Sequence, residues 1–179
     1  MNSSYNLHTD EKLWALFIDN DKQAFTILYK RYKVKLYHFF YARLYKNNET
    51  AKDFTQTLFL KLIENKSQFN TNYTFKTWIY NIANNMCKNH YRKNETIKNS
   101  YKFDSETSTN DISIDSYHFK RIFNQILTNL KEENLEIFLL RYQAHLSIKE
   151  ISKVTNKPEG TVKSKLFYTI KKMAKELKG

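Results

Sequence analysis

Polar side chains that can hydrogen-bond bases and phosphates recur at helical spacing in two parts of the sequence. The first part places four of them three or four residues apart: Asn81, Asn84, Lys88 and Arg92. The second part, after Pro158, places others beside an apolar stripe: Lys163, Ser164, Lys165, Tyr168, Lys171 and Lys172. Amides can contact base edges, and lysines neutralise phosphates. Both patterns therefore indicate nucleic-acid binding.

Aromatic side chains precede the first of these parts. The loop 66–74 contains Phe69, Asn70 and Tyr73, and Trp78 follows a few residues later. Rings beside amides suit unstacked single-stranded bases, because every base has a face on which a ring can stack. The alternative is that Phe69 and Trp78 only close a small core, and both roles can hold at once. For the second part, the alternative is an ordinary solvated lysine-rich helix face.

The sequence contains no residue pattern that is typical of an enzyme. Its five His residues are scattered without metal-ligand spacing, and no nucleophile with a base or paired-carboxylate cleft stands out. We therefore predict that the protein is not an enzyme, with no catalytic residue, no metal and no cofactor. The single cysteine, Cys87, cannot form an internal disulfide, which favours the cytoplasm. No apolar run approaches the roughly 18 residues that span a bilayer, so no membrane insertion is expected.

Composition indicates the fold class. The 179 residues carry a net charge of +12, and 41% of them are hydrophobic, which is enough for a core. Only 2 Gly and 1 Pro occur, and β-sandwiches, barrels and glycine-loop nucleotide folds need more turn residues than that. The sequence therefore predicts an all-α protein.

Apolar periodicity predicts an N-terminal helical bundle in residues 1–94. Its four helices are expected at 10–18, 22–45, 49–64 and 75–92. Residues 95–118 are acidic and have no helical apolar stripe, so they are interpreted as a flexible linker. Residues 119–179 form the second predicted domain, in which apolar stripes indicate helices over 119–130 and around 135–142.

The C-terminal part of the second domain has the pattern of a helix-turn-helix. Ser147 and Glu150 have capping-box spacing, so a short helix should begin between them. Asn156 can adopt the left-handed conformation that ends a helix, and Pro158 suits the start of the next one. The last helix is expected to bury Val162, Leu166, Ile170, Met173 and Leu177. A tight turn before a helix with a basic face is typical of DNA-binding domains.

Four motifs in this order resemble the small two-domain, extracytoplasmic-function class of bacterial RNA polymerase sigma factors. They are DFTQTLFLKL at 53–62, FKTWIYNIANN at 75–85, EI at 150–151 and EGTVKSKL at 159–166. The resemblance covers roughly residues 20–94 and 119–177. It implies that 1–94 is a region 2-like domain that binds core polymerase and opens the minus-10 element. It also implies that 119–179 is a region 4-like domain that binds the minus-35 element.

The resemblance also implies roles for individual positions. Polymerase binding is implied for three residues of the second long helix: Asp53, Gln56 and Thr57. Asp53 and Gln56 share one exposed helix face, although Asp53 could instead complement the helix dipole. Minus-10 binding and melting is implied for Phe69, Asn70, Tyr73, Trp78, Asn81, Asn84, Lys88 and Arg92. Minus-35 binding is implied for Thr161, Lys163, Ser164, Lys165, Phe167, Tyr168 and Lys171.

We therefore expect a cytoplasmic, monomeric sigma factor that binds core RNA polymerase through the clamp helices of the largest subunit and the flap. It would direct the enzyme to specific promoters and assist melting of promoter DNA. Whether an anti-sigma factor is a further partner is left open. The alternative function is a stand-alone helix-turn-helix regulator whose N-terminal bundle senses a ligand or dimerises. A DNA-processing enzyme is a second alternative, for which the sequence shows no active site.

Overall fold

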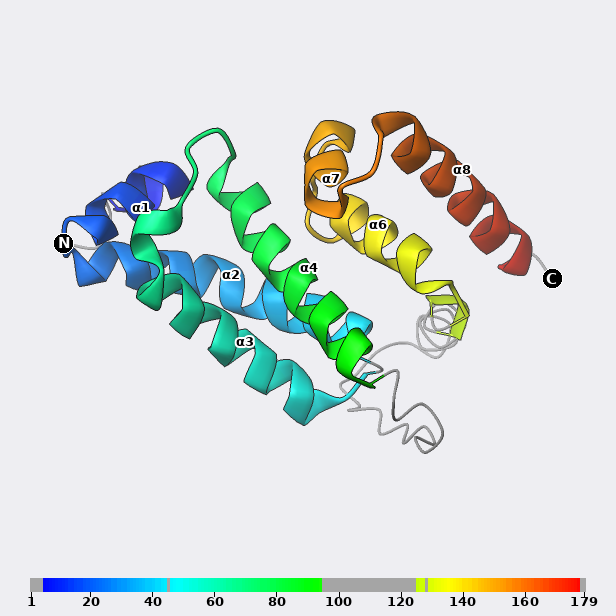
Figure 1. The fold of residues 1–179 in the computed structure, drawn as a ribbon, viewed down its shortest axis with the longest axis horizontal. Helices are drawn as coiled ribbons and strands as arrows, with labels where there is room; N and C mark the ends of the chain where they lie inside the picture. The colour runs from blue at the N-terminus through cyan, green and yellow to red at the C-terminus, as the bar shows by residue number, and fades with distance from the viewer. Residues whose placement is uncertain (1–4, 45, 95–124, 128, 178–179) are drawn as a thin grey trace.

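The computed structural model describes residues 5–44, 46–94, 125–127 and 129–177, and within these residues it contains helices and no strand. The N-terminal helices, blue to green in Figure 1, lie at one end of the molecule, and the C-terminal helices, yellow to red, lie at the other. The all-α prediction is confirmed. The predicted linker 95–118 lies outside the described residues, as does most of the helix expected over 119–130.

The N-terminal helices match the apolar periodicity closely. They are α1 (Asp10–Ile18), α2 (Lys22–Arg43), α3 (Asn48–Glu64) and α4 (Phe75–Asn94), with short 3-10 turns η1 (Tyr5–Leu7) and η2 (Lys66–Gln68). Polar side chains cap the starts of the first three α-helices: Thr9, Asp21 and Asn47. Each accepts a hydrogen bond from a backbone N–H of the first turn, which otherwise lacks a partner.

The core of the N-terminal bundle is aromatic. Trp14 of α1 is fully buried, and its ring centroid lies 5.2 Å from that of Phe75 and 5.3 Å from that of Trp78. Phe39 of α2 and Tyr80 of α4 meet edge to face with centroids 5.4 Å apart. Buried rings bring large apolar areas into contact. These contacts therefore fix α4 against α1 and α2.

The C-terminal helices form the predicted helix-turn-helix. They are α6 (Glu132–Tyr142), α7 (Ile148–Thr155) and α8 (Glu159–Glu176). Both halves of the capping box are present at Ser147 and Glu150, and Asn156 is left-handed with φ 55°. His145, at the turn before α7, also has a positive φ of 53°. Pro158 is the residue just before α8 rather than its first residue.

Two positions of the predicted stripe on α8 are wrong. Ile170 is 42% exposed and Leu177 is 39% exposed, whereas Thr169 is buried. The buried residues are spaced four, three and four residues apart along the helix: Val162, Leu166, Thr169 and Met173. Because successive residues are turned by about 100° around a helix, Ile170 lies beside this stripe and not on it.

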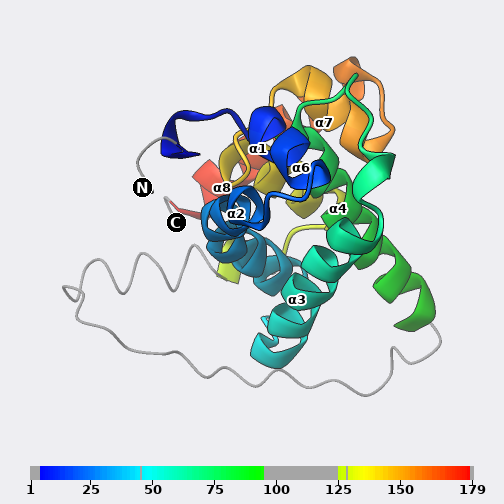
Figure 2. The same cartoon turned by 90° about the vertical axis from the view of Figure 1, so that its left-hand side faces the viewer.

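The N-terminal and C-terminal helices pack against one another. Helix α4 lies beside α7 in both Figure 1 and Figure 2, and α2 also contacts α6. The face of α4 that points away from its own bundle therefore meets the C-terminal helices. None of the described helices has the length and hydropathy needed to cross a lipid bilayer.

Candidate nucleic-acid and polymerase interfaces

Helix α3 exposes the three residues predicted to bind polymerase. Asp53, Gln56 and Thr57 are all exposed, and the opposite side of the helix is buried in the bundle. Two large apolar side chains lie further along the exposed surface, Leu60 at 58% and Ile63 at 43% exposure. Exposed apolar side chains rimmed by polar ones are typical of protein–protein contact surfaces. This surface can therefore receive another helix.

The start of α4 is held in place by groups from two other segments. The backbone N–H of Phe75 donates to Oε1 of Glu11 over 2.8 Å, which ties α4 to α1. The N–H of Thr77 donates to the hydroxyl of Thr74 over 3.1 Å. Both acceptors satisfy N–H groups that have no partner within the helix. The loop before α4 is therefore anchored at its C-terminal end.

The tip of that loop is a turn built on Asn70. Its side-chain oxygen accepts from the N–H of Asn72 over 2.9 Å, and its carbonyl accepts from the N–H of Tyr73 over 3.1 Å. Such Asx turns are local and need no support from the core. Asn70 is exposed and Tyr73 is partly buried. The turn thus brings the backbones of Asn70 and Tyr73 together and leaves the Asn70 side chain exposed.

Phe69 and Trp78 belong partly to the core. Their ring centroids are 5.1 Å apart, and both rings also contact Phe75. Each side chain nevertheless keeps an exposed part. The core role and the base-stacking role left open by the sequence are therefore geometrically compatible.

The outward face of α4 differs from the prediction at Asn84. Asn81 is partly exposed, and Arg92 is exposed and donates to the side chain of Asn89 over 2.8 Å. The predicted exposure of Asn84 is wrong, because its side chain is fully buried. The physical reason is that α6 and α7 cover this part of α4.

A buried polar cluster surrounds Asn84. Its amide nitrogen donates to Oε1 of Glu136 over 2.6 Å, and its oxygen accepts from Nη1 of Arg43 over 3.2 Å. The ammonium of Lys88 lies 3.2 Å from the same Glu136 oxygen, and Nη2 of Arg43 lies 3.2 Å from Oε1 of Glu132. Buried charges require partners of opposite sign. The cluster therefore joins α2 and α4 to α6.

Sequence analysis missed Arg43 and Glu136. The signal available for Glu136 was its place between Leu135 and Ile137 in a strongly apolar helix, where a carboxylate needs a buried partner. Arg43 had a weaker signal, because it lies at the end of a helix where basic residues are favoured anyway. Neither position alone identifies its partner.

A second set of contacts joins the start of α4 to α7. Glu150 accepts from the hydroxyl of Thr77 over 2.7 Å and from that of Thr74 over 3.1 Å. Nearby, Lys76 donates to the carbonyl oxygen of His145 over 3.1 Å. The ammonium of Lys153 lies 4.7 Å from the centre of the Tyr73 ring, a cation–π distance.

The environment of Glu150 favours its charged form. Partial burial opposes ionisation, but hydrogen bonds from the Ser147 backbone and from the hydroxyls of Thr77, Ser147 and Thr74 outweigh it and lower the pKa of Glu150 to about 2. The carboxylate therefore remains ionised at neutral pH, where it caps α7 and binds α4 at the same time.

The residues predicted to bind the minus-35 element lie on the exposed side of α8. Lys163, Ser164 and Lys171 are exposed, Thr161 and Lys165 are partly exposed, and Phe167 and Tyr168 are 61% and 66% exposed. The ammonium of Lys165 lies 2.7 Å from Oε2 of Glu133, and that of Lys157 lies 3.2 Å from Oε1 of the same side chain. The hydrogen bond from Lys165 has the largest effect on Glu133, followed by that from Lys157, and both lower the pKa of Glu133. The α8 surface thus combines free and paired ammonium groups.

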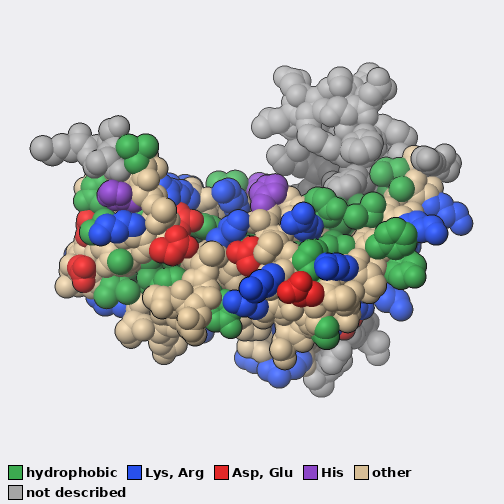
Figure 3. All heavy atoms as spheres, turned by 90° about the horizontal axis from the view of Figure 1, so that it is seen from above, with side chains coloured by type: hydrophobic (Ala, Val, Ile, Leu, Met, Phe, Trp, Pro, Cys, Tyr) green, Lys and Arg blue, Asp and Glu red, His purple; other side chains and the backbone are tan. Residues whose placement is uncertain are grey.

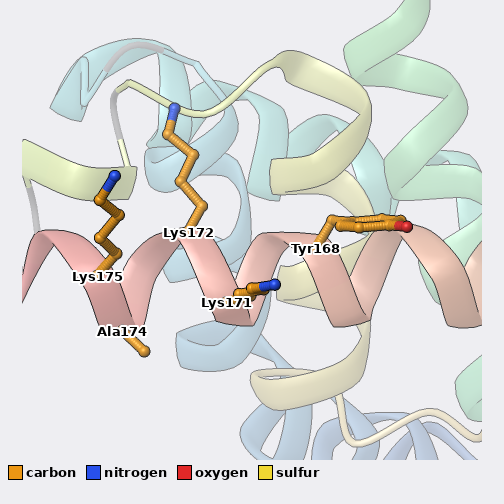
Figure 4. A pocket seen from close by; sticks show the side chains of 5 residues that line it. All are labelled: Tyr168, Lys171, Lys172, Ala174 and Lys175. Atoms are coloured by element: carbon orange, nitrogen blue, oxygen red, sulfur yellow. The ribbon is translucent and has the colours of Figure 1, made fainter.

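A surface hollow of about 680 Å³ lies along the same helix (Figure 4). It is lined by Tyr168, Lys171, Lys172, Ala174 and Lys175. Figure 3 shows lysines and hydrophobic side chains gathered at this end of the molecule. Three ammonium groups beside a ring suit a polyanion better than a neutral small molecule. In the described part of the chain, no group of three His, Cys, Asp or Glu side chains could hold a metal ion.

Comparison with known families matches both halves of the chain. The family model Sigma-70 region 2 matches residues 28–97, and the model Sigma-70, region 4 matches residues 120–173. Among curated proteins, the chain is similar to the ECF RNA polymerase sigma factor SigW of Bacillus subtilis, with 29% identity over 88% of this chain and 91% of that protein. It is also similar to the ECF RNA polymerase sigma-E factor of Haemophilus influenzae, with 28% identity over 89% of this chain and 90% of that protein.

Solved structures share the fold. The structure of CnrH in complex with the cytosolic domain of CnrY has a TM-score of 0.70 and 19% identity, and covers 94% of this chain and 97% of that chain. The sigma factor RpoE in complex with the anti-sigma factor NepR from Bartonella quintana has a TM-score of 0.71 and 17% identity, and covers 86% of this chain and 96% of that chain.

Proposed function

The chain belongs to the extracytoplasmic-function class of RNA polymerase sigma factors, and from this premise we propose which surfaces serve each step of transcription initiation. As a sigma factor, it binds core RNA polymerase and directs it to promoter DNA. The stand-alone regulator is not favoured, because both sigma regions follow one another on the chain in the order of the family.

Residues 1–94 are proposed as the domain that binds core polymerase and the minus-10 element. Residues 119–179 are proposed as the domain that binds the minus-35 element, with 95–118 as the linker between them. The two family matches, at 28–97 and 120–173, support this division. Bipartite recognition requires two surfaces on one chain, and α4 and α8 are proposed for these two roles.

Polymerase docking is proposed for the surface of α3 that contains Asp53, Gln56 and Thr57. Its partner would be the clamp helices of the largest subunit, and the flap would contact the C-terminal domain. The observation in favour is that these three side chains are exposed together with Leu60 and Ile63. Such a surface offers a helix both apolar contact and polar orientation.

Capture of the minus-10 strand is proposed for the loop 66–74 and for α4. Asn70 and Tyr73 would hold an extruded base, with Phe69 and Trp78 forming the wall behind it. Asn81 and Arg92 would contact the adjoining backbone, joined by Asn84 and Lys88 when their present partners leave. Stacking and hydrogen bonding of captured bases can offset the few kcal/mol that unpairing costs.

Minus-35 recognition is proposed for the start of α8. The side chains of Thr161, Lys163 and Ser164 would reach into the major groove, followed by Lys165, Phe167 and Tyr168. Lys171, further along the helix, would neutralise a phosphate. The exposed helix face after the tight turn is the observation that favours this role.

The remaining proposals concern regulation and cellular setting. The protein would perform no catalysis of its own and would act as a monomer in the cytoplasm, where transcription takes place. An anti-sigma factor is included among its proposed partners, since the fold neighbour RpoE was solved with one.

Run-off transcription with purified core enzyme tests this function. The chain should enable core polymerase to start at discrete sites on genomic fragments of the source organism, and no such transcripts should form without it. The single observation behind the expectation is the joint presence of both sigma regions on one chain. Duplex binding without any dependence of transcription on the chain would instead indicate the stand-alone regulator.

A further inference from the structure

Helix α1 and the turn after it contact both ends of the loop 66–74, which is proposed to capture the minus-10 strand. After the loop, Oε1 of Glu11 accepts a hydrogen bond from the backbone N–H of Phe75 over 2.8 Å. At the start of the loop, the ammonium of Lys66 donates to the side-chain oxygen of Asn20 over 3.2 Å. Glu11 lies in the first turn of α1, and Asn20 follows its last turn. One short helix therefore ties down the loop at both ends.

The end of α1 binds the Lys66 ammonium in more than one way. Asn20 is left-handed with φ 71°, and its N–H donates to the carbonyl oxygen of Phe17 over 3.0 Å, as at many helix ends. The carbonyl oxygen of Ile18 accepts from Lys66 over 3.4 Å, and the ammonium lies 5.8 Å from the centre of the Phe17 ring. The C-terminal end of a helix is partly negative, which favours a nearby cation. Lys66 is therefore held by hydrogen bonds, by charge and by a ring.

The middle of α1 supports the rings behind the loop. Trp14 is fully buried, and its ring centroid lies 5.2 Å from that of Phe75 and 5.3 Å from that of Trp78. Phe69 of the loop packs in turn on Trp78, with centroids 5.1 Å apart. Close-packed rings transmit a shift in one of them to the others. The position of α1 thus influences both the ends of the loop and the wall proposed to lie behind a captured base.

We propose that Glu11 and Lys66 are positioning residues for strand capture, which hold the loop 66–74 in the shape that receives an extruded base. The inference rests on the proposed role of this loop. The two side chains act through the loop and not by touching the base. A loop that is ordered before binding loses less conformational freedom when the base enters, so anchoring it favours capture.

Glu11→Ala gives a test whose sign is diagnostic. Removing a carboxylate ordinarily favours nucleic-acid binding, because phosphates are then repelled less. Loss of the anchor should instead slow promoter opening by the holoenzyme by about 3- to 10-fold, the effect of one lost hydrogen bond. Permanganate reactivity of unpaired thymines measures opening over time, on a fully paired promoter found by run-off transcription. Glu11→Gln keeps an acceptor oxygen and should retain most of the opening rate.

The anchor at the start of the loop needs a variant that leaves charge unchanged. Lys66→Met should slow opening to a similar degree, but it also removes a cation that DNA could contact directly. Asn20→Gly removes an acceptor of Lys66 without changing any charge, and Gly adopts a φ of 71° without strain. It should slow opening by a smaller factor, because the carbonyl oxygen of Ile18 remains. Slower opening in Lys66→Met with none in Asn20→Gly would overturn the anchoring role of Lys66.

Two variants control for charge and for stability. Asp19 is exposed directly after α1, and its side chain has no hydrogen bond or ion pair with any other residue that the structure describes. Asp19→Ala should leave the opening rate unchanged or slightly higher. Tyr37→Phe removes a hydrogen bond to Asn48 between α2 and α3, within the same bundle but outside the loop, and should also leave opening unchanged. An equal loss in Tyr37→Phe would mean that Glu11 matters only for general stability.

Hydrogen exchange reports the anchors independently of DNA. The N–H groups of Tyr73 and Phe75 are both hydrogen-bonded in the anchored loop. Without an anchor the loop should open locally more often, so peptides within 66–78 should take up deuterium about 3- to 10-fold faster in Glu11→Ala and Lys66→Met. Peptides from α3 should exchange at an unchanged rate in both variants. Exchange that is faster throughout the bundle would contradict a local anchor.

The two measurements together separate the possible failures. Faster exchange in the loop with slower promoter opening establishes the anchors. Faster exchange with unchanged opening overturns the positioning role, and the proposed function still stands if replacement of residues 70–73 abolishes opening. If that replacement also leaves opening unchanged, the proposed role of the loop in strand capture is wrong. Exchange that stays the same in both anchor variants overturns the anchoring itself, whatever happens to the opening rate.

Discussion

The side-chain amide of Asn84 donates to Oε1 of Glu136 over 2.6 Å, although 52 positions separate the two residues in the chain. Asn84 is fully buried and Glu136 is buried beside it. The bond therefore connects the N-terminal bundle to the helix-turn-helix domain inside a site from which water is excluded. A hydrogen bond to a charged group in such a site is stronger than one at the surface.

Removing the Glu136 carboxylate should destabilise the protein considerably. Glu136→Ala leaves the amide of Asn84 and the ammonium of Lys88 without their shared acceptor, and breaking a buried pair in this way costs about 3 kcal/mol. Urea unfolding measures the loss. Glu133→Ala is the control, because Glu133 is exposed and its ion pairs should contribute less than about 1 kcal/mol. Equal losses in both variants would contradict the role of the cluster.

Glu150 should make the stability of the fold depend on acid pH. Its pKa is lowered from 4.5 to about 2, because hydrogen bonds from Ser147, Thr77 and Thr74 outweigh the effect of burial. A carboxylate with a lowered folded-state pKa stabilises the fold above its unfolded pKa, and that contribution is lost as the pH falls from about 4.5 towards 2.

The variant Glu150→Gln measures this contribution. Its free energy of unfolding should be lower than that of the unchanged protein at neutral pH by about 1 kcal/mol, because Gln keeps the capping oxygen but loses the charge that strengthens these hydrogen bonds. Unfolding in urea at a series of pH values should show the difference shrinking towards zero near pH 2. A difference that is the same at every pH would mean that the charge of Glu150 is not what stabilises α7.

The double variant Asp53→Ala, Gln56→Ala should weaken binding to core polymerase by at least about tenfold, as expected when central contacts of an interface are removed. Both side chains are exposed, so the fold should be unaffected. Competition for core enzyme against a labelled copy of the chain gives the affinity. Asp19→Ala is the control, because Asp19 is an exposed carboxylate of the same bundle that lies outside α3, directly after α1. Normal competition by the double variant would exclude this face of α3 from docking.

The positions of the helices could be predicted from the sequence because their signals are local. The bounds of α2, the capping box at Ser147 and the left-handed Asn156 each depend on residues close together in the sequence, and all three occur in the structure. The predicted burial of Ile170 is wrong because the buried face of α8 includes its neighbour Thr169, a residue that hydropathy alone does not mark as buried.

The candidate site was less predictable because its burial depends on contacts between the N-terminal and the C-terminal helices. Helical spacing places Asn84 and Lys88 on one side of α4, where both contact Glu136, but it does not predict that Asn84 is buried. The helices α6 and α7 contribute the partners of α4: Glu136 lies 52 residues after Asn84, and Glu150 lies 73 residues after Thr77. Hydrophobic periodicity does not indicate which distant residues pair with one another. The buried polar partners are therefore identified only by the structure.

Two lysines of α8 should have separable roles in minus-35 binding. Lys171→Ala should weaken binding to all duplexes to a similar degree and reduce the salt slope by about one, as expected for a phosphate contact. Lys165→Ala should relax preference at one or two base pairs at a cost of about 1–3 kcal/mol. Binding to specific and random duplexes over a salt series separates the two effects. Equal losses on both kinds of DNA in both variants would reduce this face to a nonspecific patch.

Replacement of residues 70–73 by Gly and Ser should abolish promoter opening while duplex binding persists. The replacement removes the Asn70 turn and the Tyr73 ring, and each lost base stack costs about 1–3 kcal/mol. Permanganate footprinting of unpaired thymines on a fully paired promoter reports opening. A promoter with a premelted bubble should partly rescue the variant, because its bases are already unpaired and only their capture remains weakened. Normal permanganate reactivity on the paired promoter would show that the loop serves only to close the core around Phe75 and Trp78.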